Sequence, residues 1–220
     1  HNSVIKNYYQ IGVGSIGTEC ITEFMVSLLT EPLFDILRTH ERLGYGISCC
    51  ARKNNGMLAI TITVEYQENK HSSDVIDEKI EEFLREYQKT LNSINNADFV
   101  AAKRCFLSSK LSHDTDLEME VIRNFEEMRN AEIIFNRNEL EAVEIEKIKK
   151  EDILEFYNKI FIASESVRKL SIQIIGNSSN ECTFKRSGVS KIEIMNGIME
   201  KHNVMINDLK LFQDSIKICS

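Results

Sequence analysis

The chain has 220 residues, of which 42% are hydrophobic and 28% are charged. This composition is typical of a soluble globular protein and excludes collagen-like or strongly disordered classes. The length suits one well-buried domain or two small ones. A formal charge of −7 argues against a nucleic-acid or anionic-membrane binder, because such surfaces need clustered Lys and Arg.

The six cysteines stand at irregular spacing and form no CxxC pair, so neither a zinc ribbon nor a disulfide framework is predicted. A reducing compartment is the simpler inference from that usage. No apolar run approaches the roughly 20 residues that span a bilayer, and the polar start HNSVIKN does not resemble a signal peptide. We therefore expect a cytoplasmic protein without a membrane partner. Its start at His1 rather than Met is compatible with a fragment or a processed piece.

The N-terminal part predicts one strand and two helices. Residues 3–11 (SVIKNYYQI) are rich in β-branched and aromatic side chains, as strands are, and a glycine-containing stretch follows. A first helix is expected over Glu19 to Leu29, where apolar residues recur at helical spacing. Pro32 is expected to begin a second helix, because proline is tolerated in the first turn of a helix.

A hairpin is predicted next. Residues 45–52 and 58–66 are strand-like, and the Asn55-Gly56 dipeptide between them is a strong hairpin signal. In LAITITVEY the apolar side chains alternate with Thr and Glu, which indicates a sheet with one buried face. Cys49 and Cys50 are adjacent in the first of these strands, so their side chains point to opposite faces and cannot jointly bind a metal.

Helix patterns dominate the rest of the chain. A long helix is expected from about Asp74, with Ser73 or Asp74 as its cap. Three more helices are expected: one after Asn96, one from the capping box at 115–118, and one over 151–161. The apolar stripe of the long helix comprises Ile76, Ile80, Phe83, Leu84, Tyr87 and Leu91.

This order of elements, closed by a strand at 170–175 (LSIQII), predicts an α+β fold. A mainly antiparallel sheet would be covered on one face by helices. We expect one domain over 1–176, a polar mobile loop over 177–191, and a C-terminal segment over 192–220 that packs back on the domain.

The side chains that carry chemistry are scattered. No HExxH or HxxEH spacing places two ligands on one helical face, and the sequence has no GxSxG motif and no Walker A loop. We therefore expect no catalytic residue and no metal site in this chain. The five histidines are His1, His40, His71, His113 and His202.

Five stretches carry a resemblance to a known family: NYYQ at 7–10, EPLFDILRTHERLGY at 31–45, the strand ending in Tyr66-Gln67, VIDEKIEEFL at 75–84 and KKEDILEFY at 149–157. They resemble the C-terminal domain of the insulinase, or pitrilysin-like, zinc metallopeptidases of the insulin-degrading and nardilysin type. The stretch at 31–45 is long and rarely matched by chance, whereas the others are more generic amphipathic patterns.

The resemblance implies a metallopeptidase domain fold of the mitochondrial processing peptidase kind, placed last of four related domains in a clamshell. In that family the zinc ligands and the catalytic glutamate lie in the first domain, in an HxxEH helix. The resemblance therefore implies no cofactor in this chain and zinc in the parent enzyme, so the chain alone would be inactive. The implied partners are peptide substrates and the N-terminal catalytic half of the same polypeptide. A homo-oligomer is also compatible with it, and nucleic acid is not implied.

The resemblance also implies that Arg38 and Tyr45 bind substrate. In the family pattern these two residues reach into the catalytic chamber, hold the substrate backbone and help to polarise the scissile carbonyl. Both match here, and an arginine fork and a phenol are suitable donors to a peptide carbonyl. His40 stands where the family usually has Lys. Gly46 replaces a customary larger residue, which would loosen the backbone of Tyr45.

A purely structural interpretation of these residues stays open. Arg38 could pair with Glu41 or Asp35 on the helix surface, an interaction of about a few tenths of a kcal/mol. Tyr45 could be a strand residue that covers the sheet.

The first hypothesis is therefore a non-catalytic C-terminal domain of a zinc metalloendopeptidase that degrades peptides. It would close the chamber and bind substrate. The alternative is a free-standing, catalytically inactive peptide-binding or interaction module, whose acidic surface would favour basic partners. A scaffold subunit like those of respiratory complexes that share this fold is a weaker, fold-level analogy.

Overall fold

A computed structural model describes residues 2–67, 70–112, 114–130, 132–163, 167–176 and 193–195. Its strands are β1 (Asn2–Val13), β2 (Gly46–Asn54), β3 (Met57–Gln67), β4 (Lys169–Ile174) and β5 (Glu193–Met195). Its helices are α1 (Ile16–Phe34), α2 (Ser73–Ser93), α3 (Asn96–Lys110), α4 (Leu117–Arg129), α5 (Arg137–Lys147) and α6 (Lys150–Tyr157). Two π-helical segments, η1 (Asp35–His40) and η2 (Asn158–Ile162), extend α1 and α6.

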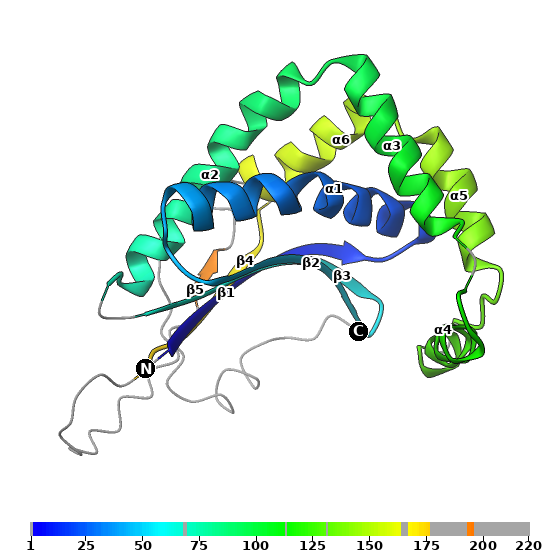
Figure 1. Ribbon diagram of the computed structural model, residues 1–220, viewed down its shortest axis with the longest axis horizontal. Coiled ribbons are helices and arrows are strands. Elements are labelled where there is room, and N and C mark those ends of the chain that lie inside the picture. Colours follow the sequence, from blue (N-terminus) through cyan, green and yellow to red (C-terminus); the bar gives the residue numbers. More distant parts are fainter. Residues whose placement is uncertain are drawn as a thin grey trace.

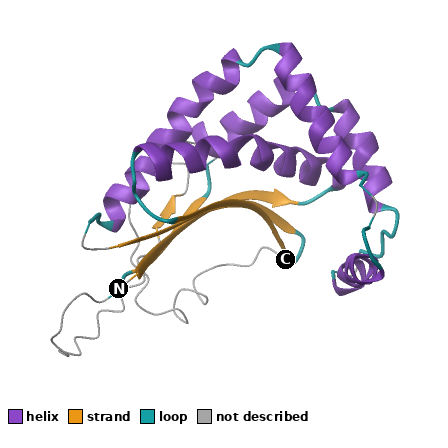
Figure 2. Ribbon diagram, viewed as in Figure 1, coloured by secondary structure: helices purple, strands orange, loops and turns teal. Residues whose placement is uncertain are grey.

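The strands form one five-stranded sheet in the order β2-β3-β1-β4-β5, and every neighbouring pair is antiparallel. The helices other than α4 lie over one face of this sheet (Figure 1), and Figure 2 shows the two layers in separate colours. This arrangement confirms the predicted α+β class. In the described part of the chain, no helix is long and apolar enough to cross a bilayer.

The core lies between the sheet and the helices and follows the predicted periodicities. Ile5 and Tyr9 on β1 and Ile62 on β3 are fully buried on the helix-facing side of the sheet. Burial of one such side chain stabilises the fold by about 1.5–3 kcal/mol. The long-helix stripe is confirmed, because all its members are buried: Ile76, Ile80, Phe83, Leu84, Tyr87 and Leu91.

The expectation of two helices separated at Pro32 was wrong. α1 continues through Pro32 into η1. Proline has no N–H, so the carbonyl of Leu28, four residues earlier, loses its helical donor. The Tyr87 hydroxyl of α2 donates to that carbonyl at 2.8 Å. A side chain from a distant helix thus satisfies the group that the proline leaves unpaired.

The hairpin is confirmed: Asn55 and Gly56 have φ of 48° and 77°, as a tight two-residue turn requires. The caps differ from expectation. Ser72 rather than residue 73 or 74 caps α2. α4 begins after the cap Asp116, whose carboxylate accepts from the Met119 amide, and not at a box begun by Thr115.

Helix α5 is not predicted by any pattern in the sequence. Of its residues only Glu141 and Ile145 are buried, so a charged side chain takes half of the buried face and the apolar period is faint. The predicted loop 177–191 lies outside the described residues. So does the C-terminal segment 192–220, apart from 193–195, which form β5.

Candidate functional site

The end of the first helix positions Arg38. Leu33 and Leu37, four residues apart, are 1% exposed and face the core, so the side chain of Arg38 points outward. η1 ends in a wide turn, in which the Glu41 amide donates to the Ile36 carbonyl at 2.9 Å. The chain then reverses towards β2.

Arg38 has an aromatic contact instead of an ion pair. Its guanidinium carbon lies 4.8 Å from the centroid of the Phe34 ring, within cation–π range. The two carboxylates that could have paired with it have other partners: Asp35 lies 3.4 Å from His40, and Glu41 lies 3.4 Å from Lys79. Arg38 makes no salt bridge within the described ranges, so its donors remain available to a ligand.

Tyr45 precedes β2 and is 48% exposed. Its amide donates to the Glu65 carbonyl of β3 at 3.1 Å. Desolvation first, and then the Glu65 carboxylate, raise the pKa of Tyr45 above its ordinary value, so the phenol keeps its proton at neutral pH. Tyr45 thus lies just outside the strand and exposes about half of its surface.

Glycines flank Tyr45 on both sides because β3 lies close. A Cβ at Gly44 would lie 2.1 Å from the Glu65 carbonyl oxygen, which no side chain can tolerate. A Cβ at Gly46 would lie 2.9 Å from the Glu65 carboxyl carbon. The segment 44–46 is thus in tight contact with the neighbouring strand. Arg38 and Tyr45, the predicted pair, both lie where the chain passes from η1 to β2. No hydrogen bond joins their side chains in the described structure.

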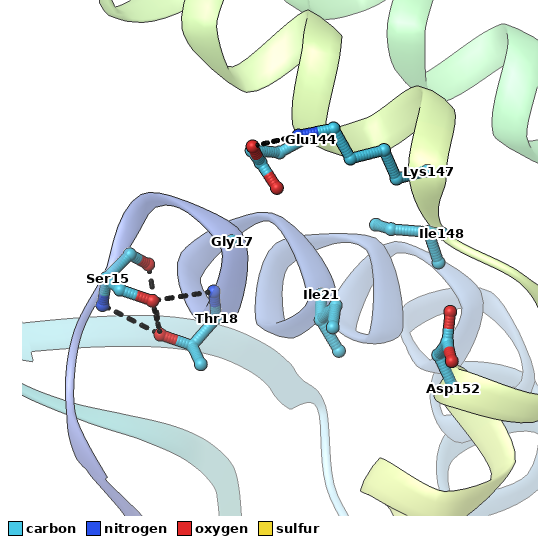
Figure 3. A pocket seen from close by; sticks show the side chains of 8 residues that line it. All are labelled: Ser15, Gly17, Thr18, Ile21, Glu144, Lys147, Ile148 and Asp152. Carbon is cyan, nitrogen blue, oxygen red and sulfur yellow. Dashed lines mark hydrogen bonds and ion pairs between the residues drawn. The ribbon is translucent and has the colours of Figure 1, made fainter.

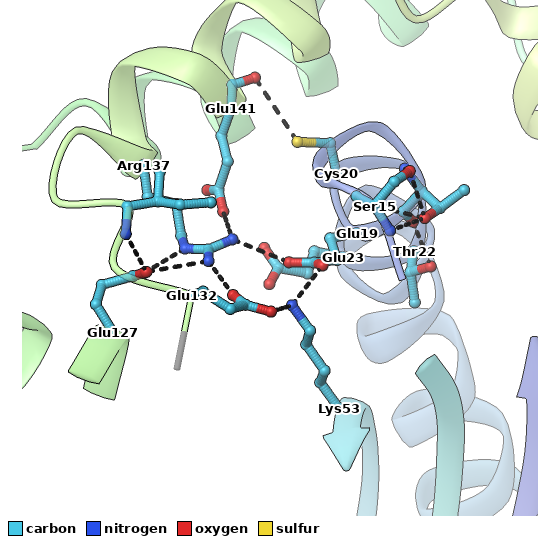
Figure 4. Close-up of polar contacts among 12 residues, drawn as sticks. Ser15, Glu19, Cys20, Thr22, Glu23, Lys53, Glu127, Glu132, Arg137 and Glu141 are labelled. Carbon is cyan, nitrogen blue, oxygen red and sulfur yellow. Dashed lines mark hydrogen bonds and ion pairs between the residues drawn. The ribbon is translucent and has the colours of Figure 1, made fainter. Parts of the chain in front are cut away.

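A second polar region surrounds Arg137 at the start of α5 (Figure 4). The Arg137 guanidinium contacts Glu127 of α4 and Glu132, and lies 3.1 Å from Glu19 of α1. Lys53, at the end of β2, bridges Glu19 and Glu132. This Arg137 cluster therefore links the sheet and three helices through charges. No sequence pattern indicates this cluster, because its members come from five separate segments.

The electrostatics of the Arg137 cluster are those of paired charges. The hydrogen bond from Arg137 lowers the pKa of Glu127, and the same bond raises the pKa of Arg137. The basic side chains occupy the space between the carboxylates. Accordingly, the described residues contain no group of three or more His, Cys, Asp or Glu side chains that could hold a metal ion.

A hollow of about 270 Å³ lies at the start of α1, against the end of α5 and the start of α6 (Figure 3). Its polar side chains already have partners in the protein. Ser15 and Thr18 cap each other, Lys147 pairs with Glu144, and Asp152 accepts from the Lys149 amide. Arg38 and Tyr45 are not among its lining residues, so this hollow is separate from the segment that carries them.

Comparison with known sequences gives relatives named nardilysin and insulin-degrading enzyme. The family described as PQQ synthase PqqF-like, C-terminal lobe domain 4, matches residues 24–125, which include Arg38 and Tyr45. Nardilysin from Homo sapiens is 30% identical over 180 residues, covering 82% of this chain and 16% of nardilysin. Insulin-degrading enzyme from Drosophila melanogaster is 30% identical over 214 residues, covering 96% of this chain and 21% of the enzyme. The chain thus spans about one sixth to one fifth of these relatives.

Solved structures share the fold. Pitrilysin matches with a TM-score of 0.70 and 13% identity, over 82% of this chain and 19% of pitrilysin. The inactive peptidase domain of a putative zinc protease from Bordetella parapertussis matches with a TM-score of 0.61 and 11% identity, over 82% of this chain and 96% of that domain. The fold therefore occurs both within a larger peptidase and as a domain that is inactive.

Proposed function

Because the chain belongs to the insulinase, or pitrilysin-like, family and corresponds to the C-terminal domain of its nardilysin-type members, we propose that it is a non-catalytic, substrate-holding domain of a zinc metalloendopeptidase. In this proposal it closes a chamber over the peptide. Hydrolysis belongs to the N-terminal catalytic half of the same polypeptide, where zinc activates water.

The observation that carries this proposal is the state of Arg38. Its guanidinium is exposed, lacks a carboxylate partner among the described residues, and rests on the ring of Phe34. The ring restrains the side chain without using the N–H donors, which can then bind a peptide carbonyl in a fixed fork. The protonated hydroxyl of Tyr45 adds one more donor to the same connection.

The proposal is tested with Arg38→Ala in the complete enzyme. Loss of a donor that acts in the transition state lowers turnover by about 10²–10³-fold, and we expect a loss of at least about tenfold on short peptides. Zinc content should not change, because the proposal places the zinc ligands in the N-terminal catalytic half. Arg42→Asn is the matched control: Arg42 is exposed, has a φ of 54° that Asn tolerates, and is cationic like Arg38. Near-normal turnover of Arg38→Ala would contradict the proposal.

A cytoplasmic location is proposed with it. The support is the cysteine usage: Cys20, Cys49, Cys50 and Cys105 are free thiols in the described structure, as a reducing compartment allows. Cell fractionation, with detection of the chain alongside markers for cytosol and the secretory pathway, checks this location. Recovery in the secretory fraction would contradict it.

A further inference from the structure

Helix α4 is held to the rest of the domain by one polar side. Arg123 and Glu127 are four residues apart and therefore lie on the same side of the helix. The Arg123 guanidinium donates to the Asp114 carboxylate at 2.9 and 3.1 Å. The Glu127 carboxylate pairs with Arg137 and accepts from the Ile134 amide at 3.1 Å. Charge and hydrogen bonds thus fix which side of α4 faces the domain.

The apolar side chains of α4 lie away from that anchored side. Leu117, Val121 and Phe125 recur every four residues, so they form one continuous stripe along the helix. Successive residues are rotated by about 100° about the helix axis, which places this stripe roughly opposite Arg123 and Glu127. The three side chains are 75%, 56% and 56% exposed. A surface helix normally turns its apolar stripe to the core, whereas α4 turns it to solvent.

The turn after α4 adds a strained apolar residue to this exposed end of the domain. Ile133 has a φ of 55° and is 64% exposed. The left-handed region is an outlier for a β-branched residue, because Cβ crowds the following carbonyl. The Ile133 amide donates to the Glu127 carbonyl at 3.3 Å, so the anchor of α4 also holds this conformation. Strain of this kind occurs preferentially at binding and switch surfaces.

The length of the relatives indicates what covers the stripe. The chain spans 16% of human nardilysin and 21% of the Drosophila insulin-degrading enzyme. As the C-terminal domain of such a polypeptide, it is joined to a much longer chain that precedes it. A covalently linked domain is present at high effective concentration, so it can cover the stripe without a separate binding partner. Soluble proteins rarely leave a large contiguous apolar patch in water.

Charge describes the surface that fits. Glu118 and Glu120, in the first turn of α4, are exposed and form no salt bridge within the described residues. We propose that α4 docks, through Leu117, Val121 and Phe125, onto a preceding domain of the same polypeptide, whose matching face is apolar and bordered by Lys or Arg. The inference rests on the proposed function, because it needs the longer enzyme.

Photo-crosslinking in the complete enzyme identifies what covers the stripe. p-Benzoylphenylalanine is incorporated in place of Phe125, and the cross-linked peptides are identified by mass spectrometry. We expect cross-links within one polypeptide, to residues that precede His1 of this chain. Cross-links between two copies, cross-links to residues 196–220, or the absence of cross-links would each overturn the inference.

Substitutions in the stripe test whether it is covered. Val121→Gln and Phe125→Gln should change little if the two side chains stay in water. If a domain covers them, hydrogen exchange of α4 in the complete enzyme should accelerate by about tenfold or more. The matched control is Val75→Gln, which replaces a valine of α2 that is 42% exposed and should leave exchange of α4 unchanged. Unchanged exchange of α4 in both stripe variants would also overturn the inference.

Arg38→Ala in the same enzyme separates this inference from the proposed function. Near-normal turnover of Arg38→Ala, together with cross-links from position 125 to a preceding domain, would remove the substrate role and support the docking surface. Reduced turnover of Arg38→Ala without those cross-links would overturn the docking of α4 alone.

Discussion

The body of the domain and α4 are attached to the fold by different forces. In the body, α2 buries a complete apolar stripe against the sheet, and the connection bearing Arg38 and Tyr45 is anchored by buried leucines and strand pairing. α4 stands apart from the helical layer in Figure 1, and its single buried residue is charged, Glu127. The following apolar side chains of α4 are instead exposed: Leu117, Met119, Val121, Ile122, Phe125 and Met128.

This difference indicates that apolar burial stabilises the body of the domain but not α4. A helix of 13 residues is marginal in water without packing, and α4 obtains ionic contacts in place of packing. Glu127 pairs with Arg137, and Arg123 pairs with Asp114 at 2.9 Å. The stability of α4 should therefore depend on charge, whereas that of the body should depend on burial.

The largest effect is expected from Arg137→Met. The Arg137 side chain is 17% exposed and forms salt bridges with four carboxylates, those of Glu19, Glu127, Glu132 and Glu141. Its removal leaves Glu127 without an ionic partner, whereas Glu19 and Glu132 keep Lys53. A buried pair that loses one partner is destabilised by about 3 kcal/mol. Hydrogen exchange should show early loss of protection in α4, and the melting temperature should fall.

The matched control is Arg129→Met at the end of α4, where the arginine side chain is 62% exposed. Its effect should stay within about 0.5 kcal/mol. Equal destabilisation by both changes would contradict the role given to the Arg137 cluster.

A smaller effect is expected in the body from Tyr87→Phe. This change deletes the donor to the Leu28 carbonyl that Pro32 leaves without a helical partner. An unsatisfied buried carbonyl costs about 1–3 kcal/mol, measurable by denaturant unfolding. Tyr8→Phe serves as control, because the Tyr8 side chain is only partly buried and lies on the opposite side of the sheet from Tyr9. If the two variants unfold alike, the account of Pro32 is wrong.

The smallest effect is a pH dependence of α4. The pKa of Glu127 is lower in the folded state than its ordinary value, chiefly through the hydrogen bond from Arg137. Its contribution is therefore complete above the unfolded carboxyl pKa of about 4.3 and disappears as pH falls through the lower folded value. Exchange of α4 amides, corrected for intrinsic rates, should rise at acidic pH before that of α2. Glu127→Gln should flatten this dependence, and an unaltered dependence would exclude Glu127 as its source.

Sequence reasoning succeeded where the signal is local. The stripe of α2 and the Asn55-Gly56 turn depend on residues close in the chain, and both are confirmed. The alternation in β3 holds from Ile62 to Tyr66, whereas residues 58–62 are all buried. Sequence reasoning failed where a distant group decides the structure. The continuity of α1 past Pro32 needs the Tyr87 hydroxyl, which is 59 residues away in sequence from its acceptor.

The candidate site divides in the same way. Arg38 and Tyr45 were identified from one contiguous stretch, residues 31–45. Their role in binding peptide stays a prediction. The neighbours that set their surroundings could not be found from that stretch. Phe34 lies one helical turn away, but its ring contact with Arg38 depends on rotamers, and Glu65 reaches Tyr45 only through the β2–β3 register. Pairing register is a property of the folded sheet that a single strand sequence does not specify.

The most direct test of the central claim is the size of the endogenous protein, measured by immunoblot with an antibody against residues 72–91. A domain of a nardilysin-type peptidase should appear as a band far larger than the 25.4 kDa of this chain. Immunoprecipitation of that band should recover zinc-dependent peptidase activity. A band at 25.4 kDa without such activity would contradict the account and favour a free-standing, inactive peptide-binding module.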